Sequence, residues 1–189
     1  IMDSDSDGLN DYEEVIVYNT DPNESDSDSD GINDYDEVSN CVYGKDNNEC
    51  TDPNDSDSDN DGLNDYNEIN NTTWGPTDPR EADTDSDGLN DGTEVNFYGS
   101  DPKDSDTDDD GLNDYDEVNS CIYGEDNNEC TDPWIPDSDG DGLNDYDEIN
   151  EYDTDPMNAD SDDDELDDGL EISNLKPVAS GSLKSKSHL

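Results

Sequence analysis

The chain has very few basic side chains and few apolar ones. Only 6 of its 189 residues are Lys or Arg, against 60 that are Asp or Glu, and the formal net charge is −54 at pH 7. Nucleic acid and anionic membrane surfaces should repel such a chain. Hydrophobic residues make up 25%, which is too little for the core of a globular domain of this length. No apolar run is long enough to span a bilayer, so we expect no membrane insertion.

The groups that enzymes commonly use are also scarce. The single histidine, His188, lies in a Ser- and Lys-containing segment at the C-terminal end. The four cysteines do not lie in a reactive setting, and there is no Gly-rich phosphate loop. Paired carboxylates are abundant, but the pattern described next explains them as metal ligands. We therefore expect no enzymatic activity in this segment.

One twelve-residue pattern organises the chain, and Asp137–Glu148 (DSDGDGLNDYDE) shows it clearly. Carboxylates occupy positions 1, 3, 5, 9 and 12, and the residue at position 7 can offer its backbone carbonyl. Gly142 at position 6 permits a sharp turn that other residues adopt only with strain. Numerous, flexible oxygen ligands at this spacing are typical of a calcium-binding loop.

The pattern occurs seven times, and we number the copies loop 1 to loop 7 along the chain. Six copies have glycine at position 6, whereas loop 7 has Glu165 there. We expect at least one calcium ion in each loop, and a chain that is expanded without calcium and ordered with it, because ion binding then supplies the folding energy. The predicted ligands, at positions 1, 3, 5, 7, 9 and 12, are Asp3, Asp5, Asp7, Leu9, Asp11 and Glu14; Asp26, Asp28, Asp30, Ile32, Asp34 and Glu37; Asp57, Asp59, Asp61, Leu63, Asp65 and Glu68; Asp83, Asp85, Asp87, Leu89, Asp91 and Glu94; Asp106, Asp108, Asp110, Leu112, Asp114 and Glu117; Asp137, Asp139, Asp141, Leu143, Asp145 and Glu148; and Asp160, Asp162, Asp164, Leu166, Asp168 and Glu171.

The loops form a duplicated array. Their starting positions differ by 23, 31, 26, 23, 31 and 23 residues, so the spacing repeats every 80 residues. Arrays of this kind are usually elongated. We therefore predict an elongated array over residues 1–174, followed by a basic, Ser- and Gly-containing linker or tail over residues 175–189.

Each loop is followed by a short apolar segment. The Asn and Asp at positions 8 and 9 favour a helix of one or two turns, which would hold the position-12 glutamate and turn the apolar position-13 residue inward. Five loops have tyrosine at position 10, and we expect these rings to pack in small clusters. We expect very little β-structure.

A Thr/Ser-Asp-Pro motif precedes each later loop. Proline prevents a helix from running into the loop, and this excludes an ordinary pair of flanking helices. The aspartate lies five residues before the first ligand of the loop, as Asp155 does before Asp160. Two interpretations remain open: it ligates a second or neighbouring ion, or it forms a turn.

Two equally spaced cysteine pairs lie in inserts between loops. We predict the disulfides Cys41–Cys50 and Cys121–Cys130, which indicate an extracellular or cell-surface location. Asn23, Asn54, Asn70 and Asn71 lie in sequons that permit glycosylation. No export signal precedes Asp3, so we expect a fragment of a longer, exported protein.

The motif D-x-D-x-D-G-L-N-D-x-x-E followed by T-D-P resembles the thrombospondin type 3 repeats and their bacterial and archaeal relatives. The resemblance covers nearly all of residues 3–174. It implies a calcium-loaded, mostly irregular array in which ions replace the apolar core, with two ions in some units. It also places such repeats at cell surfaces.

Three functions fit these observations. The array can be a calcium-stiffened stalk, spacer or filament subunit, whose partners are copies of itself or adjacent domains. It can be an adhesion module, for which Trp74 and Trp134 are the candidate partner contacts, although both can instead pack over a disulfide or a proline turn. It can also be a calcium buffer.

Overall fold

The computed structural model describes residues 2–40, 50–119 and 130–175. The chain divides into two compact units, Ile1–Thr107 and Asp108–Leu189. The basic tail after Leu175 lies outside the described residues, so the predicted boundary near residue 174 stays a prediction.

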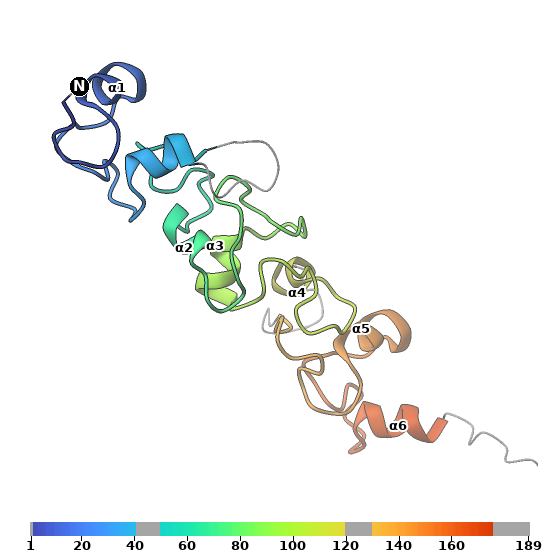
Figure 1. Cartoon of the computed structure of the whole chain (residues 1–189). Helices are drawn as coiled ribbons and strands as arrows, with labels where there is room; N and C mark the ends of the chain where they lie inside the picture. Colours follow the sequence, from blue (N-terminus) through green and yellow to red (C-terminus); the bar gives the residue numbers. More distant parts are fainter. Residues whose placement is uncertain (1, 41–49, 120–129, 176–189) are drawn as a thin grey trace, which may run out of the picture. The chain divides into compact units, whose positions relative to one another are not determined.

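Short helices separated by irregular loops make up both units (Figure 1). The first unit contains α1 (Asp11–Glu13), η1 (Glu14–Tyr18), η2 (Asp36–Asn40), α2 (Asp65–Ile69), α3 (Asp91–Thr93) and η3 (Glu94–Tyr98). The second contains α4 (Asp114–Asn119), α5 (Asp145–Asp147), η4 (Glu148–Tyr152) and α6 (Asp168–Leu175). The η elements are single wide turns of π-helix. The described ranges contain no β-strand, which confirms the predicted irregular array with short helices after the loops.

Helices α1, α2 and α5 begin where the sequence predicts, because the side chain of the position-8 asparagine caps them. The Asn10 side chain accepts hydrogen bonds from the backbone N–H groups of Tyr12 and Glu13. The Asn64 side chain likewise accepts one from the N–H of Asn67. These bonds satisfy N–H groups that the first helical turn leaves without a partner. Acidic residues in that turn add a favourable interaction with the helix dipole.

Buried carboxylates, rather than apolar side chains, form most of the interior. Among the described residues, five apolar side chains other than prolines are buried, and all occupy loop position 7: Leu9, Ile32, Leu63, Leu89 and Leu143. The largest fully buried side chains are instead loop glutamates and aspartates. The position-13 residues are half-buried in loops 2 to 7, but Val15 in loop 1 is 53% exposed. The prediction that this residue turns inward is therefore wrong for the first repeat.

Candidate metal centre

The first three carboxylates of a loop point toward one place. In loops 1 to 4, one oxygen from each residue at positions 1, 3 and 5 lies within 4.8 Å of the others, as in the group of Asp57, Asp59 and Asp61. The glycine at position 6 makes this curl possible. Gly62 has a φ of 102°, and the equivalent Gly142 has a φ of 103°, a conformation that side chains with a Cβ rarely adopt.

The glutamate at position 12 is buried in loops 1 to 6 and half-buried in loop 7. Glu14, Glu68, Glu94 and Glu148 have no exposed surface. Their Oε2 atoms are buried and accept no hydrogen bond, and neither does Oε1 of Glu14. Buried carboxylate oxygens without a donor are energetically costly. A bound cation with oxygen ligands would remove that cost, so the donor set fits a calcium ion.

A hydroxyl group holds the other oxygen of this glutamate. The side chains of Thr77, Ser100 and Thr154 donate to Oε1 of Glu68, Glu94 and Glu148 at 3.1–3.2 Å. Each hydroxyl belongs to the residue just before an Asp-Pro pair. The only sequence signal for this contact is that the residue before each Asp-Pro pair is always Thr or Ser.

Burial and neighbouring charges raise the pKa of these glutamates. Burial is the main cause, and the aspartates at positions 3 and 5 add to it. The pKa rises to about 9 for Glu37, Glu68, Glu94 and Glu117, and to about 8 for Glu148. Without a cation, these side chains would therefore hold protons at neutral pH. A divalent ion supplies the positive charge that lets them ionise while buried.

The position-9 aspartate contacts residues of its own loop and lies close to carboxylates of the loop before it. Within its own loop it accepts two hydrogen bonds from the position-2 residue: Asp65 accepts from the backbone N–H of Ser58 at 2.8 Å and from its hydroxyl at 2.7 Å. It also reaches the loop before it. Oxygens of Asp61, Glu68 and Asp91, from positions 5 and 12 of loop 3 and position 9 of loop 4, lie within 4.8 Å of one another.

The position-5 aspartate connects successive loops. Its Oδ1 accepts from the position-7 N–H of its own loop, as Asp30 does from Ile32 at 2.6 Å. Its Oδ2 accepts from the position-10 N–H of the next loop, as Asp30 does from Tyr66 at 3.2 Å. The same link occurs at 2.6–3.1 Å in four other pairs: Asp7 with Tyr35, Asp61 with Gly92, Asp110 with Tyr146, and Asp141 with Gly169.

Two kinds of junction follow from the residue at position 10. Where it is tyrosine, the ring lies over the position-6 glycine of the preceding loop: a Cβ on Gly8 would be 3.0 Å from Cγ of Tyr35. Gly31 and Gly111 meet Tyr66 and Tyr146 in the same way. Where position 10 is glycine, the backbones approach closely, and a Cβ on Gly92 would overlap the carbonyl oxygen of Asp61. The predicted tyrosine clusters are therefore contacts with the loop before.

The Asp of the Thr/Ser-Asp-Pro motif forms a turn. Oδ1 of Asp21 accepts from the backbone N–H of Asn23 at 3.1 Å, and Asp155 and Met157 are paired in the same way. The backbone N–H of each aspartate donates to the position-2 hydroxyl of the following loop, as Asp21 does to Ser27 at 2.9 Å. Of the two interpretations, the turn is the one that these contacts favour.

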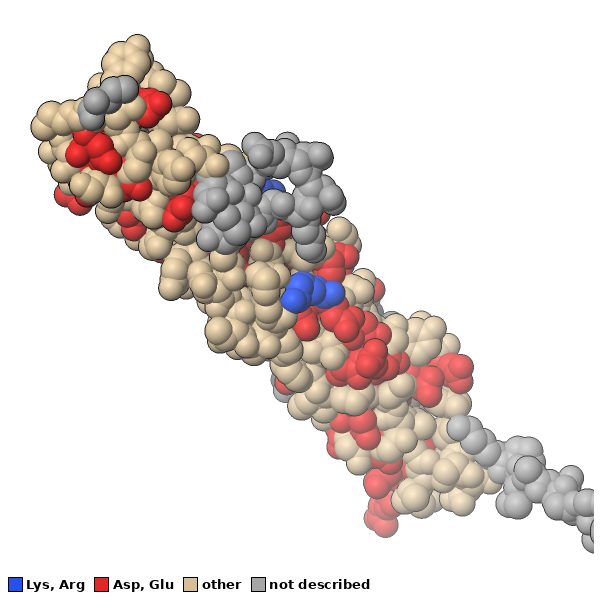
Figure 2. All heavy atoms as spheres, viewed as in Figure 1, with Lys and Arg blue, Asp and Glu red and all other residues tan. Residues whose placement is uncertain are grey.

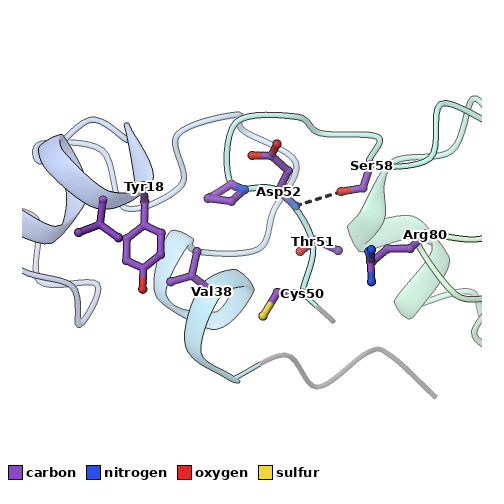
Figure 3. Close-up of a pocket in the computed structure, with 9 residues that line it drawn as sticks. Tyr18, Val38, Cys50, Thr51, Asp52, Ser58 and Arg80 are labelled. Atoms are coloured by element: carbon purple, nitrogen blue, oxygen red, sulfur yellow. Dashed lines mark hydrogen bonds between the residues drawn. The ribbon is translucent and has the colours of Figure 1, made fainter. Parts of the chain in front are cut away.

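Cys50, Trp74, Cys130 and Trp134 belong to the segments between the loops. Cys50 and Val38 help line a cleft of about 520 Å³, together with Tyr18 and Arg80 (Figure 3). Neither Cys50 nor Cys130 is a free thiol, while Cys41 and Cys121 lie outside the described residues, so the predicted disulfide pairing stays a prediction. Trp134 is 47% exposed and Trp74 is half-buried.

Groups of acidic side chains are scattered over the face that Figure 2 displays, and far fewer basic ones are visible there. Within the described ranges, no helix combines the length and apolar character needed to cross a membrane.

Comparison with known proteins agrees with the loop geometry. The model of a family described as bacterial TSP3 repeat matches residues 3–25, 57–71, 83–105, 106–120 and 137–159, just over half of the chain. No curated protein matches. A solved structure titled "Biofilm associated protein - BSP domain" is 43% identical over 24% of this chain, with a TM-score of 0.22. The matched part spans only 7% of that protein.

Proposed function

Because the chain belongs to the bacterial TSP3 repeat family, we propose that it is an extracellular, calcium-binding array that acts as a stiff stalk, spacer or filament subunit. The observation that carries this proposal is the interior of the loops. Glu14, Glu68, Glu94 and Glu148 are fully buried, and each has an oxygen without a hydrogen-bond donor. Ionised carboxylates can stay in such an interior only when cations fill it, so calcium would control the order of the array wherever these groups are ionised.

Stiffness arises where one loop meets the next. The position-5 aspartate takes part in the predicted calcium shell of its own loop and accepts a hydrogen bond from the following one, as Asp61 does from the N–H of Gly92 at 2.7 Å. Calcium binding therefore holds the position-5 carboxylate in place, and this carboxylate in turn holds the backbone of the next loop. This connection favours a mechanical role over a simple calcium buffer, which would need no contact between loops.

The number of ions is expected to exceed one per loop. The group of Asp61, Glu68 and Asp91 lies between loops 3 and 4 and is buried. Its Glu68 contributes an oxygen that has no hydrogen-bond donor. This donor set supports a second ion beside the one held by Asp57, Asp59 and Asp61.

A calcium titration tests the proposal. Circular dichroism and small-angle scattering should both change as calcium is added, and native mass spectrometry should count more than seven ions. The same dimensions with calcium and with a chelator would contradict the stalk. Calcium uptake without any change of dimensions would instead favour the buffer.

The extracellular assignment rests on the cysteines and on the family. We infer that Cys50 pairs with Cys41 and Cys130 with Cys121, because each insert has the same spacing and neither Cys50 nor Cys130 is a free thiol. Disulfides suit an oxidising exterior, and an array that depends on calcium suits a calcium-rich one. Peptide mapping without reduction should recover the two local pairs.

A second candidate function is adhesion between copies, and one exposed segment favours it. Trp134 and Ile135 follow Pro133 and are 47% and 44% exposed. The equivalent residues of the other insert are Asn54 and Asp55. Sedimentation in calcium should show self-association that Trp134→Asn removes. If both proteins sediment as monomers over the whole concentration range, adhesion between copies through this segment is excluded.

A further inference from the structure

Positions 4 and 6 of every loop have left-handed backbone conformations, but the residues at these positions differ from loop to loop. The φ angle at position 4 is positive in all seven loops, as it is at Ser29 and Asn60, both with a φ of 63°. It is also positive at position 6, where loops 1 to 6 have glycine. Loop 6 has glycine at both positions, Gly140 and Gly142, whereas loop 7 has glycine at neither. Loops 6 and 7 are therefore the two extremes of one series.

Loop 7 makes the same turn as loop 6 without the glycine. The backbone N–H of Glu165 donates to Oδ2 of Asp160 at 2.9 Å, just as the N–H of Gly142 donates to Oδ2 of Asp137 at 3.0 Å. Glu165 has a φ of 78°, so the glutamate adopts a conformation in which its Cβ crowds its own backbone. Asp163 at position 4 has a φ of 60°, which aspartate tolerates better than most residues. The backbone strain of loop 7 is therefore greatest at Glu165.

We propose that Glu165 gives loop 7 a calcium affinity on the order of tenfold lower than that of loop 6, so that the two loops fill at different calcium concentrations. The proposal rests on the calcium-filled loops proposed above. A loop without calcium can relax its backbone, so ion binding imposes the strain at position 6 and loses that free energy. Glycine gives up more conformational freedom when a loop becomes ordered, but at a positive φ this cost is the smaller of the two.

The charge of Glu165 acts in the opposite direction and has the smaller effect. An additional carboxylate attracts calcium, but this side chain is exposed, so water and salt screen the attraction and keep its effect on affinity below about fivefold. The backbone strain arises from the Cβ and does not depend on salt. A glutamine at position 165 would therefore keep the strain and lose the charge, while a glycine would lose both.

Helix α6 (Asp168–Leu175) is the element that responds to this difference, because its first residue is position 9 of loop 7. The Asp168 side chain accepts from the backbone N–H of Ser161 at 3.2 and 3.3 Å. The equivalent bond in loop 6, from Ser138 to Asp145, is shorter at 2.8 Å. Over the calcium range in which loop 6 is filled and loop 7 is empty, α6 has no ion beside its first turn. The order of α6 thus reports the calcium concentration while loop 6 stays loaded.

Hydrogen exchange of the whole chain at a series of free calcium concentrations tests the proposal. Protection of residues 137–148 and of residues 160–175 should have separate midpoints, with the loop 7 midpoint on the order of tenfold higher. Glu165→Gly should lower the loop 7 midpoint by about tenfold and leave the loop 6 midpoint unchanged. The matched control is Glu165→Gln, which should not lower the loop 7 midpoint. These variants isolate residue 165 from every other difference between the two loops.

The reverse substitution provides a second measurement. No atom lies within 4 Å of a Cβ built on Gly142, so Gly142→Glu adds backbone strain without a contact at the Cβ and should raise the loop 6 midpoint. A common midpoint for both loops of the parent chain would overturn the proposal. So would equal lowering of the loop 7 midpoint by Glu165→Gln and Glu165→Gly, because charge rather than strain would then weaken the site. If calcium protected neither loop at any concentration, the calcium-filled array itself would be refuted, and this proposal with it.

Discussion

The backbone N–H of Tyr66 donates to Oδ2 of Asp30, a residue 36 positions earlier, at a distance of 3.2 Å. The other oxygen of Asp30 accepts from Ile32 within its own loop. The Asp30 carboxylate thus joins the turn of loop 2 to the start of α2, the helix that begins within loop 3. Its removal should affect two repeats rather than one.

Asp30→Ala should therefore lower the free energy of unfolding of the calcium-loaded chain by about 1.5–3 kcal/mol, the usual cost of losing hydrogen bonds to a charged group. Hydrogen exchange should accelerate both in loop 2 and in α2 (Asp65–Ile69). Asp104→Ala is the control, because Asp104 is exposed and belongs to no loop. Faster exchange confined to loop 2 would contradict the bridging role.

Thr77→Val should weaken calcium binding at loop 3. The Thr77 hydroxyl donates to Oε1 of Glu68 at 3.2 Å, and its loss leaves the glutamate less well oriented, at a cost of about 1 kcal/mol or a few-fold in affinity. Isothermal titration with calcium measures this change. Thr72→Val, at an exposed position, should leave the titration unaltered. If both variants bind as the parent chain does, the hydroxyl has no positioning role.

Glycine substitutions should separate the two effects of position 6. Gly8 and Gly62 both have positive φ values, 121° and 102°, so alanine strains the backbone at each. Only at Gly8 would the new Cβ also meet a tyrosine ring, since nothing lies within 4 Å of it at Gly62. Gly8→Ala should thus lower the thermal midpoint more than Gly62→Ala, and Tyr35→Ala should remove the difference. Equal effects would show that backbone strain alone matters.

Acid should order the calcium-free chain. Burial raises the pKa of Glu68 to about 9 from its usual 4.5, so the folded form binds more protons than the unfolded form between these values. The resulting stabilisation is complete below about 4.5 and is lost as the pH rises toward about 9. Circular dichroism in chelator should show more helix at pH 5 than at pH 8.5.

With calcium present, the effect of pH on stability should reverse. Protons compete with calcium for the same carboxylates, so acidification should release ions and lower the thermal midpoint. A calcium-free chain whose spectrum is the same at pH 5 and pH 8.5 would contradict the burial of these glutamates.

The sequence predicts the content of each loop better than the contacts between loops. The spacing of Asp, Gly and Glu indicates the turn at Gly142 and the cap at Asn144, because both depend on neighbouring residues. The family match confirms the repeat assignment, while the assignment of individual ligands stays a prediction. The contacts of Asp30 with Tyr66 and of Gly92 with Asp61 join residues 36 and 31 positions apart, and no local pattern specifies which faces meet. The step between loops does not specify the junction type either, because steps of 23 residues lead both to Tyr35 and to Gly169.

The small apolar interior also determines how stability depends on temperature. Apart from prolines, only five apolar side chains are buried among the described residues, so unfolding exposes little hydrocarbon to water. The heat-capacity change of unfolding should therefore be far below the roughly 12–15 cal/mol/K per residue of ordinary globular proteins. A small heat-capacity change gives a shallow stability curve. At a fixed calcium concentration, such a chain would keep nearly constant stability from cold to warm conditions and would resist cold denaturation.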